Sequence, residues 1–187
     1  MTHSTFQPLA GIRVLDITQV LAGPYASYQL ALMGAEVIKI ERPGDGDWTR
    51  SGGTDADLAK AQMGLPYLTQ NANKKSVTLD LKQERGRAVL QRMLSSCDVF
   101  LENLRPGAMS TLGFSFEQVR QFRPDIVYCS ISAFGQDGPL NKRRAYDHVV
   151  QGMCGIMHAT GSRESGPTKV GAPYIDYATG LNGAFAI

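Results

Sequence analysis

The sequence is poor in several features that mark common classes of protein. Its 187 residues include three cysteines, Cys97, Cys129 and Cys154, which are odd in number and widely spaced. This pattern argues against a disulfide framework and against a zinc site. Apolar runs fall well short of the ~20 residues that a membrane-spanning helix needs. The opening residues MTHSTFQPLAG lack a charged and apolar leader. We therefore expect reduced thiols, no metal, no membrane association and a cytoplasmic location.

A strong excess of either charge is also lacking. The formal net charge is +2, from 19 basic and 17 acidic residues, and the basic residues are scattered along the chain. This balance predicts no nucleic-acid partner, but it leaves room for a small ligand that carries phosphate. With 43% hydrophobic and 19% charged residues and no repeat, the composition is typical of one globular domain.

Segments typical of strands alternate with helical segments along the chain. Strands are predicted at residues 12–17, 36–41, 75–81, 98–102 and 125–132. Helices are predicted at residues 25–33, 82–96, 108–112, 115–123 and 146–159 and after residue 176, whereas residues 43–57 are predicted to form a loop. The alternation indicates an α/β fold with an open, mainly parallel, Rossmann-like sheet and helices on both faces.

Two familiar patterns of cofactor binding and catalysis are missing. The turn after the first strand holds Gly23 followed by Pro24, not the G-x-G-x-x-G that brings a backbone close to pyrophosphate. Glu41, at the end of the second strand, is therefore insufficient to indicate an NAD site. There is also no G-x-S-x-G elbow, and His148 and His158 fall in a predicted helix without a metal-ligand pattern around them.

Six motifs, in order, carry a resemblance to a known family. They are VLDITQVLAGPYASYQLALMGAEVIKIERPGDGD, NANKKSVTLDLK, ENLRPGAMSTLGF, YCSISAFGQDGP, AYDHVVQ and VGAPYIDYATGLNGAFAI. Together they resemble the class III CoA-transferases, the CaiB–BaiF family that includes formyl-CoA transferases. Members of that family are about twice as long, and the final segment GLNGAFAI is still apolar. We therefore expect residues 1–187 to be the N-terminal part of the large domain, without its second half and without the small domain.

The resemblance implies that Asp176 is the nucleophile, because the family's catalytic aspartate stands just before the matching T-G-L segment. In the family this carboxylate attacks an acyl-CoA thioester and forms an aspartyl mixed anhydride. Returning CoA then gives an aspartyl-CoA thioester, which serves a small carboxylic acid as acceptor. Covalent catalysis divides one difficult transfer into easier steps. By position alone, Asp176 would instead be interpreted as a helix N-cap.

The resemblance also implies that CoA lies across the carboxyl ends of the strands, with no metal. The predicted contacts are Val20, Leu21, Ala22, Arg42, Leu79, Asp80, Leu81, Lys82, Asn103, Leu104, Arg105, Arg144, Ala145, Tyr146 and Asp147. The basic members of this set suit the phosphates of CoA. Taken singly, each of those basic residues is more simply explained as a solvated surface charge.

Two alternatives to a CoA-transferase stay open. The related α-methylacyl-CoA racemases have a histidine where this chain has Tyr146, and a tyrosine ionises too far above neutrality to serve as a base. His148 would point to another side of the helix, so the transferase is favoured. The chain is alternatively an inactive remnant or fragment. Family dimers interlock through the second half of the chain, so we expect a homodimer of the full-length form. We expect this shorter chain to expose apolar surface and to associate.

Overall fold

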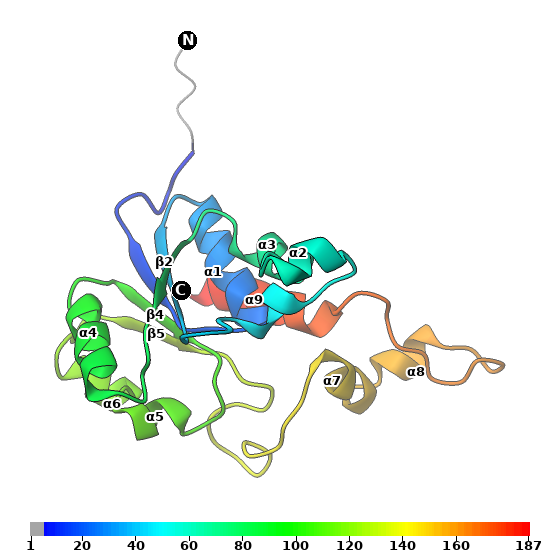
Figure 1. The fold of residues 1–187 in the computed structure, drawn as a ribbon. Helices are drawn as coiled ribbons and strands as arrows, with labels where there is room; N and C mark the ends of the chain where they lie inside the picture. The colour runs from blue at the N-terminus through cyan, green and yellow to red at the C-terminus, as the bar shows by residue number, and fades with distance from the viewer. Residues whose placement is uncertain (1–5) are drawn as a thin grey trace.

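A five-stranded parallel sheet forms the centre of the computed structural model, which describes residues 6–187 (Figure 1). Part of the segment assessed for a leader, residues 1–5, lies outside the described residues. The strands are β1 Arg13–Asp16, β2 Glu36–Glu41, β3 Lys75–Thr78, β4 Val99–Glu102 and β5 Val127–Ser130. Their order is β3-β2-β1-β4-β5, and every neighbouring pair is parallel. This doubly wound arrangement confirms the predicted fold class.

Helices cover both faces of the sheet. One face carries α1 (Ala22–Leu32) and α9 (Tyr174–Ala186), with α3 (Leu65–Asn71) beside α1, and the other carries α4 (Glu84–Leu94), α5 (Ala108–Leu112) and α6 (Phe116–Arg120) (Figure 1). An arm built from α7 (Asp147–Met153) and α8 (Ile156–Thr160) extends away from the sheet. The connection between β2 and α3 holds η1 (Trp48–Ser51) and α2 (Ala56–Lys60). Within residues 6–187, we find no helix with the length and apolar character needed to span a bilayer.

The core has one apolar layer on each side of the sheet. Val14 and Leu15 follow each other in β1, are both fully buried, and point to opposite faces because side chains alternate along a strand. Val14 belongs to the cluster that includes Ala26 of α1 and Ala184 of α9. Leu15 belongs to the cluster that includes Leu90 of α4. The central strands are therefore apolar on both faces, as parallel strands in such folds are.

Three local predictions were wrong. The helix predicted at residues 146–159 is divided into α7 and α8, because Gly155 has φ +85°, outside the helical range. The region predicted as a loop contains η1, whose cap Asp47 accepts a hydrogen bond from the backbone N–H of Thr49. The third strand ends at Thr78, so residues 79–81 extend beyond the edge of the sheet.

Buried charged side chains fix the shape of the loop that follows β1. Lys39 and Asp47 form an ion pair of 3.1 Å with fully buried side chains. The Lys39 ammonium donates to the carbonyl of Thr18 at 2.7 Å, and the Asp47 carboxylate accepts from the N–H of Val20 at 3.1 Å. Val20 has φ +73°, which is unfavourable for a β-branched residue and persists only where surrounding contacts impose it. These contacts give the loop a defined shape at the edge where the site forms.

Candidate active site

The loops after β1 and β4 lie side by side at the point where the strand order reverses. Asn103 joins them, since its Oδ1 accepts from the N–H of Gln19 and its Nδ2 donates to the carbonyl of Gln19, each at 2.8 Å. In doubly wound sheets, ligands bind outside the carboxyl ends of the strands at this switch point. The amide of Asn103 therefore fixes the relative position of the two loops that border such a site.

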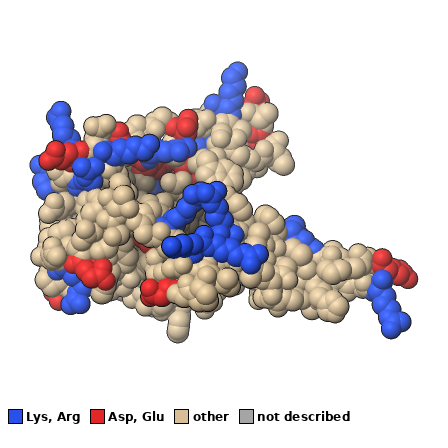
Figure 2. All heavy atoms as spheres, turned by 90° about the horizontal axis from the view of Figure 1, so that it is seen from below, with Lys and Arg blue, Asp and Glu red and all other residues tan. Residues whose placement is uncertain are grey.

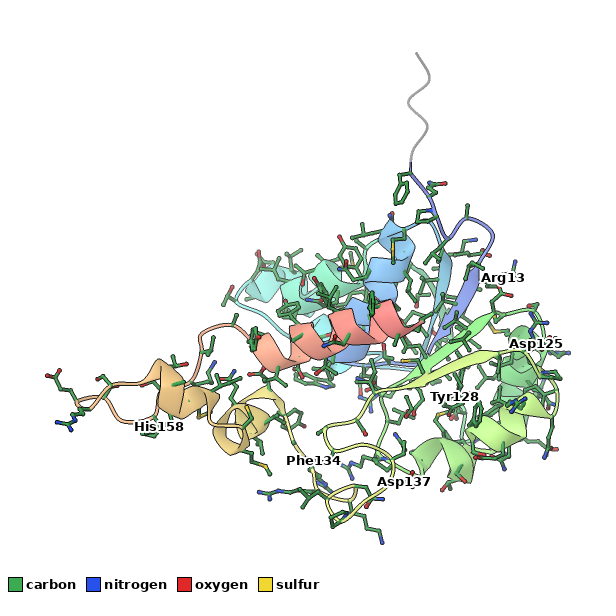
Figure 3. All side chains as sticks on the ribbon, turned by 180° about the vertical axis from the view of Figure 1, so that it is seen from behind. Arg13, Asp125, Tyr128, Phe134, Asp137 and His158 are labelled. Atoms are coloured by element: carbon green, nitrogen blue, oxygen red, sulfur yellow. The ribbon has the colours of Figure 1, made fainter. Side chains whose placement is uncertain are left out.

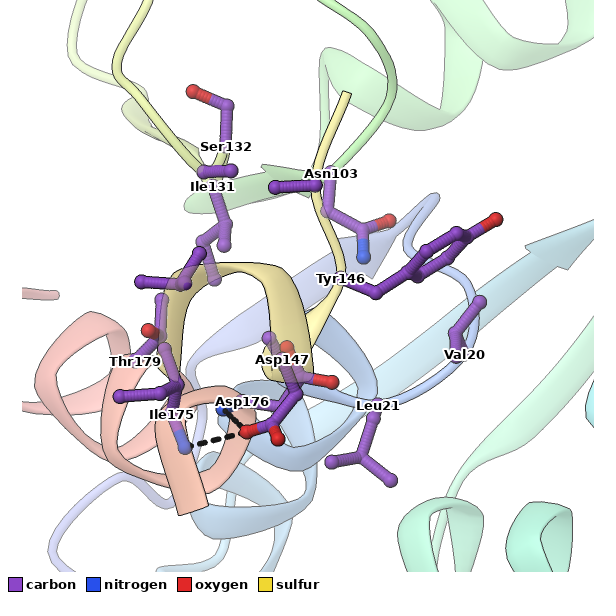
Figure 4. Close-up of a pocket in the computed structure, with 14 residues that line it drawn as sticks. Val20, Leu21, Asn103, Ile131, Ser132, Tyr146, Asp147, Ile175, Asp176 and Thr179 are labelled. Atoms are coloured by element: carbon purple, nitrogen blue, oxygen red, sulfur yellow. Dashed lines mark hydrogen bonds between the residues drawn. The ribbon is translucent and has the colours of Figure 1, made fainter. Parts of the chain in front are cut away.

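A cavity of about 320 Å³ opens at this position (Figure 4). Its lining combines the loops after β1, β4 and β5, the start of α7 and the first two turns of α9. The predicted site residues among its lining are Val20, Leu21, Ala22, Asn103, Ala145, Tyr146, Asp147 and Asp176. The structure therefore brings the predicted nucleophile together with predicted contacts from three distant parts of the sequence.

Asp176 is a half-buried carboxylic acid in the first turn of α9. The N-cap of this helix is Pro173, so the interpretation of Asp176 as an N-cap was wrong. Burial, followed by the nearby charge of Asp147, raises the pKa of Asp176 to about 6, while His148 acts in the opposite direction. Within residues 6–187 no hydrogen bond to the Asp176 carboxyl group is present. With a pKa of about 6 the group is ionised at neutral pH and more basic than an ordinary aspartate, and Asp176 is among the residues that line the cavity.

Asp147 caps α9 from outside the helix. Its Oδ1 accepts from the backbone N–H groups of Ile175, at 2.7 Å, and Asp176, at 3.3 Å (Figure 4). Its Oδ2 accepts from the side-chain amide of Gln151, whose own oxygen accepts from the N–H of Val170 at 2.9 Å. Gln151 was missed as a site residue. The signal was present in AYDHVVQ, where Asp147 and Gln151 are four residues apart and share a helix face.

Two further cavities continue along the same edge of the sheet. The second, of about 400 Å³, shares Val20, Asn103, Ala145 and Tyr146 with the first and adds the predicted residues Leu104, Arg105 and Arg144. The third, of about 250 Å³, shares Leu104 with the second and is lined by the remaining predicted residues Arg42, Leu79, Asp80, Leu81 and Lys82. Figure 2, which views the molecule from below, shows basic side chains gathered across part of this face. The shared lining residues make one elongated path that leads away from Asp176.

Comparison with known proteins decides the family. The model of CoA-transferase family III matches residues 9–187. The chain belongs to this family. This confirms the family and the enzyme class that the motifs predicted.

Relatives within family III have several substrates in their names. The chain is 43% identical over 177 residues to the mouse succinyl-CoA:glutarate CoA-transferase, and the aligned region covers 95% of this chain and 40% of that protein. It is 44% identical over 164 residues to the acetyl-CoA:oxalate CoA-transferase of Acetobacter aceti, covering 88% of this chain and 41% of that protein. A CAIB/BAIF family protein from Brucella suis has a similar structure, with a TM-score of 0.88 and 35% identity over 96% of this chain and 47% of that chain. The family III chain thus spans less than half the length of these relatives.

His148 and His158 are not among the residues that line the first cavity. His158 lies on the arm, on α8, as Figure 3 shows. The ring of His148 stacks on that of Tyr146 with centroids 6.2 Å apart, and His148 is not among the residues that line the first cavity. Within residues 6–187, no group of three or more potential metal ligands is found. Among the residues that line the first cavity, Asp176 has a carboxyl group whose pKa is raised to about 6.

Proposed function

We propose that this chain carries the nucleophile and the acyl-CoA-binding edge of an enzyme that moves CoA from a thioester to a carboxylic acid through a covalent intermediate on Asp176. One observation carries the proposal. A partly desolvated carboxyl group with a pKa of about 6 lies, without a hydrogen-bond partner among residues 6–187, at one end of a path lined by basic and apolar side chains. Within CoA-transferase family III, that arrangement suits covalent acyl transfer.

The reaction divides into exchanges at one carboxylate. An oxygen of Asp176 attacks the thioester carbonyl carbon, a C–O bond forms, the C–S bond breaks, and CoA leaves as the thiolate. Asp176 then forms part of a mixed anhydride, and the thiolate attacks its γ-carbon, which releases the donor's carboxylate and leaves an aspartyl-CoA thioester. The acceptor carboxylate then attacks the aspartyl-CoA thioester and expels CoA thiolate, which gives a second mixed anhydride. The thiolate attacks the acceptor's carbonyl carbon in this anhydride, which releases the new acyl-CoA and regenerates the Asp176 carboxylate. Burial assists because it excludes the water that would hydrolyse the anhydride.

The chemistry of the path fits CoA. Arg42, Lys82, Arg105 and Arg144 supply positive charge for its phosphates, and leucines between them supply apolar surface. The hydroxyl of Ser132, which lines the first two cavities, is buried and has no hydrogen-bond partner within residues 6–187. A polar atom of a bound ligand would satisfy it. Asp147, also predicted to contact CoA, lines the first cavity, but its carboxylate accepts hydrogen bonds from α9. Its contribution to CoA binding is therefore steric.

The remaining predictions follow from the resemblance to the family. We propose that residues 1–187 form the N-terminal part of the large domain of a longer protein that acts as an interlocked homodimer in the cytoplasm. Acyl-CoA and a small carboxylic acid would be its partners, without a metal. The relatives' names include succinyl, acetyl and formyl donors, so these three thioesters form the first panel to test.

Covalent capture tests the proposed nucleophile. The chain is exposed briefly to succinyl-, acetyl- or formyl-CoA, treated with hydroxylamine, and measured by intact-protein mass spectrometry. An adduct that maps to Asp176 is expected, and it should disappear in Asp176→Asn but persist in Glu164→Gln, which changes an exposed carboxylate. Because the nucleophile must be ionised, adduct formation should decline as the pH falls through about 6, the pKa of Asp176.

Other outcomes would contradict the transferase. An absence of adducts combined with entry of solvent deuterium at the acyl α-carbon would indicate the racemase alternative. An absence of both would indicate the inactive remnant. An adduct that survives Asp176→Asn would place the nucleophile elsewhere.

A further inference from the structure

The N-terminus of α9 depends on a residue far away in the sequence. The first backbone N–H groups of any helix lack partners within the helix, and the cap position here is Pro173, whose side chain offers no acceptor. Asp147 supplies the missing acceptor to the N–H groups of Ile175 and Asp176 from 28 and 29 residues upstream. A carboxylate in this place is also favoured by the positive end of the helix dipole.

Asp147 is in turn held by Gln151, which is fully buried. The Gln151 amide has one accepting and one donating end, and both are used. Its oxygen accepts from the N–H of Val170, and its nitrogen donates to Asp147. The hydrogen bonds therefore run in one sense, from the chain that returns from the arm, through Gln151, to the carboxylate that caps α9.

We infer that Asp147 and Gln151 act as a positioning pair for Asp176, setting both the place and the charge environment of its carboxyl group. This inference rests on the proposed role of Asp176 as nucleophile. Within the described chain, the charged and titratable side chains that face Asp176 from α7 are Asp147 and His148, and Tyr146 lines the same cavity. Asp147 makes Asp176 more basic and His148 opposes that effect, so the negative charge of the pair is the dominant charged influence.

Exchanging the two side-chain types tests the pair. In Asp147→Asn, the amide nitrogen of the introduced asparagine faces the amide nitrogen of Gln151, so two donors meet. If the Gln151 amide turns over instead, Gln151 loses the hydrogen bond from the N–H of Val170. In Gln151→Glu, two carboxylates meet. The double variant restores the full pattern, because the introduced carboxylate at position 151 accepts from both the introduced amide and the N–H of Val170. Each single variant should lower the Tm, and the double variant should recover most of the summed loss.

A matched control uses the same residue types at the same spacing. Gln121→Glu and Asp125→Asn change exposed residues that form no hydrogen bond with each other within residues 6–187. Their effects on Tm should be small and additive. If losses at Asp147 and Gln151 were also additive, the two residues would not act as a pair and the inference would be wrong.

The pKa of Asp176, followed by carboxyl ¹³C NMR in the 187-residue chain, separates positioning from packing. The double variant keeps the hydrogen bonds but moves the negative charge from position 147, which caps α9, to position 151, which has no hydrogen bond to α9. The pKa of Asp176 should therefore fall by at least about half a unit relative to the parent, and any adduct formation should extend to correspondingly lower pH. An unchanged pKa would overturn the inference. Failure of the parent chain to form an adduct would contradict the proposed function, while the NMR and Tm results would still decide whether the pair acts on Asp176.

Discussion

The burial that raises the pKa of Asp176 also opposes folding. Its pKa is about 6 in the folded chain, whereas an unfolded aspartate titrates near ~3.9. Folding therefore favours the protonated form, and the stability of the chain falls as the pH rises from the unfolded value to the folded one. Below about pH 4 both states are protonated and the penalty is absent. Reactive groups commonly reduce stability in this way.

Removing the charge should consequently stabilise the protein. Asp176→Asn should raise stability at pH 8 by about 1 kcal/mol, a figure reduced to allow for solvent screening of a half-buried group. The gain should shrink between about pH 6 and pH 4, which thermal melts across this range would measure. Asp45→Asn, at an exposed position, serves as the control. A gain that grows as the pH falls would contradict the burial of an ionised Asp176.

At the scale of residues, the local motif predicts a role for Asp176 but not the side chains that hold it. The role of Asp176 as nucleophile stays a prediction, made because a specific motif surrounds this residue. Its cap could not be predicted, because the acceptor comes from Asp147 in another segment and no local rule connects the two. Gln151 has one partner within the same motif, the side chain of Asp147, but its second partner is the backbone N–H of Val170. A backbone partner leaves no trace in residue type.

At the scale of elements, α9 is placed by its close crossing with α1. A Cβ atom added at Gly180 would lie 2.4 Å from the carbonyl oxygen of Ala22, a backbone atom that cannot yield without moving a helix. Gly180 is one turn after Asp176, and Ala22 begins α1 at the cavity. The glycine thus sets how closely α9, which carries the proposed nucleophile Asp176, approaches the loop after β1.

Two glycines of the same helix allow this to be tested. Gly180→Ala should destabilise the chain by roughly 2 kcal/mol or more, despite the better helix propensity of alanine, and should reduce adduct formation at Asp176. Gly183→Ala should be neutral or stabilising, because its Cβ would lie 3.1 Å from the flexible end of the Ile131 side chain and 3.7 Å, an ordinary contact distance, from the Cβ of Ala26. Chemical denaturation and adduct mass spectrometry give both readouts. Equal effects of the two substitutions would show that the crossing does not fix α9.

The prediction of helices and strands was right where burial imposes a pattern of apolar residues. It was wrong where the structure of a short segment depends on its surroundings. The strands were predicted because a sheet covered on both faces requires runs of apolar, β-branched residues. The helix α3 was not predicted, since it is only seven residues long and Pro66 at its start also suits a loop. The break at Gly155 was missed because helices tolerate an isolated glycine.

At the scale of the whole molecule, α9 presents an uncovered apolar stripe. Tyr174, Leu181 and Phe185 are 54%, 55% and 92% exposed, and their spacing of seven and four residues places them on one side of the helix. The opposite side of α9 packs on α1 and contributes the buried Ala184. A helix that is apolar on both sides favours burial on both sides.

The stripe predicts that this chain associates with further copies of itself. Sedimentation velocity over a range of concentrations should show a rise in the mean sedimentation coefficient. The combined variant Leu181→Ser and Phe185→Ser should suppress that rise, because it removes the largest exposed apolar side chains of the stripe. Phe6→Ser is the control, since Phe6 is 84% exposed and does not belong to α9. A concentration-independent monomer would contradict the prediction. Association that the serine variant leaves intact would assign it to another surface.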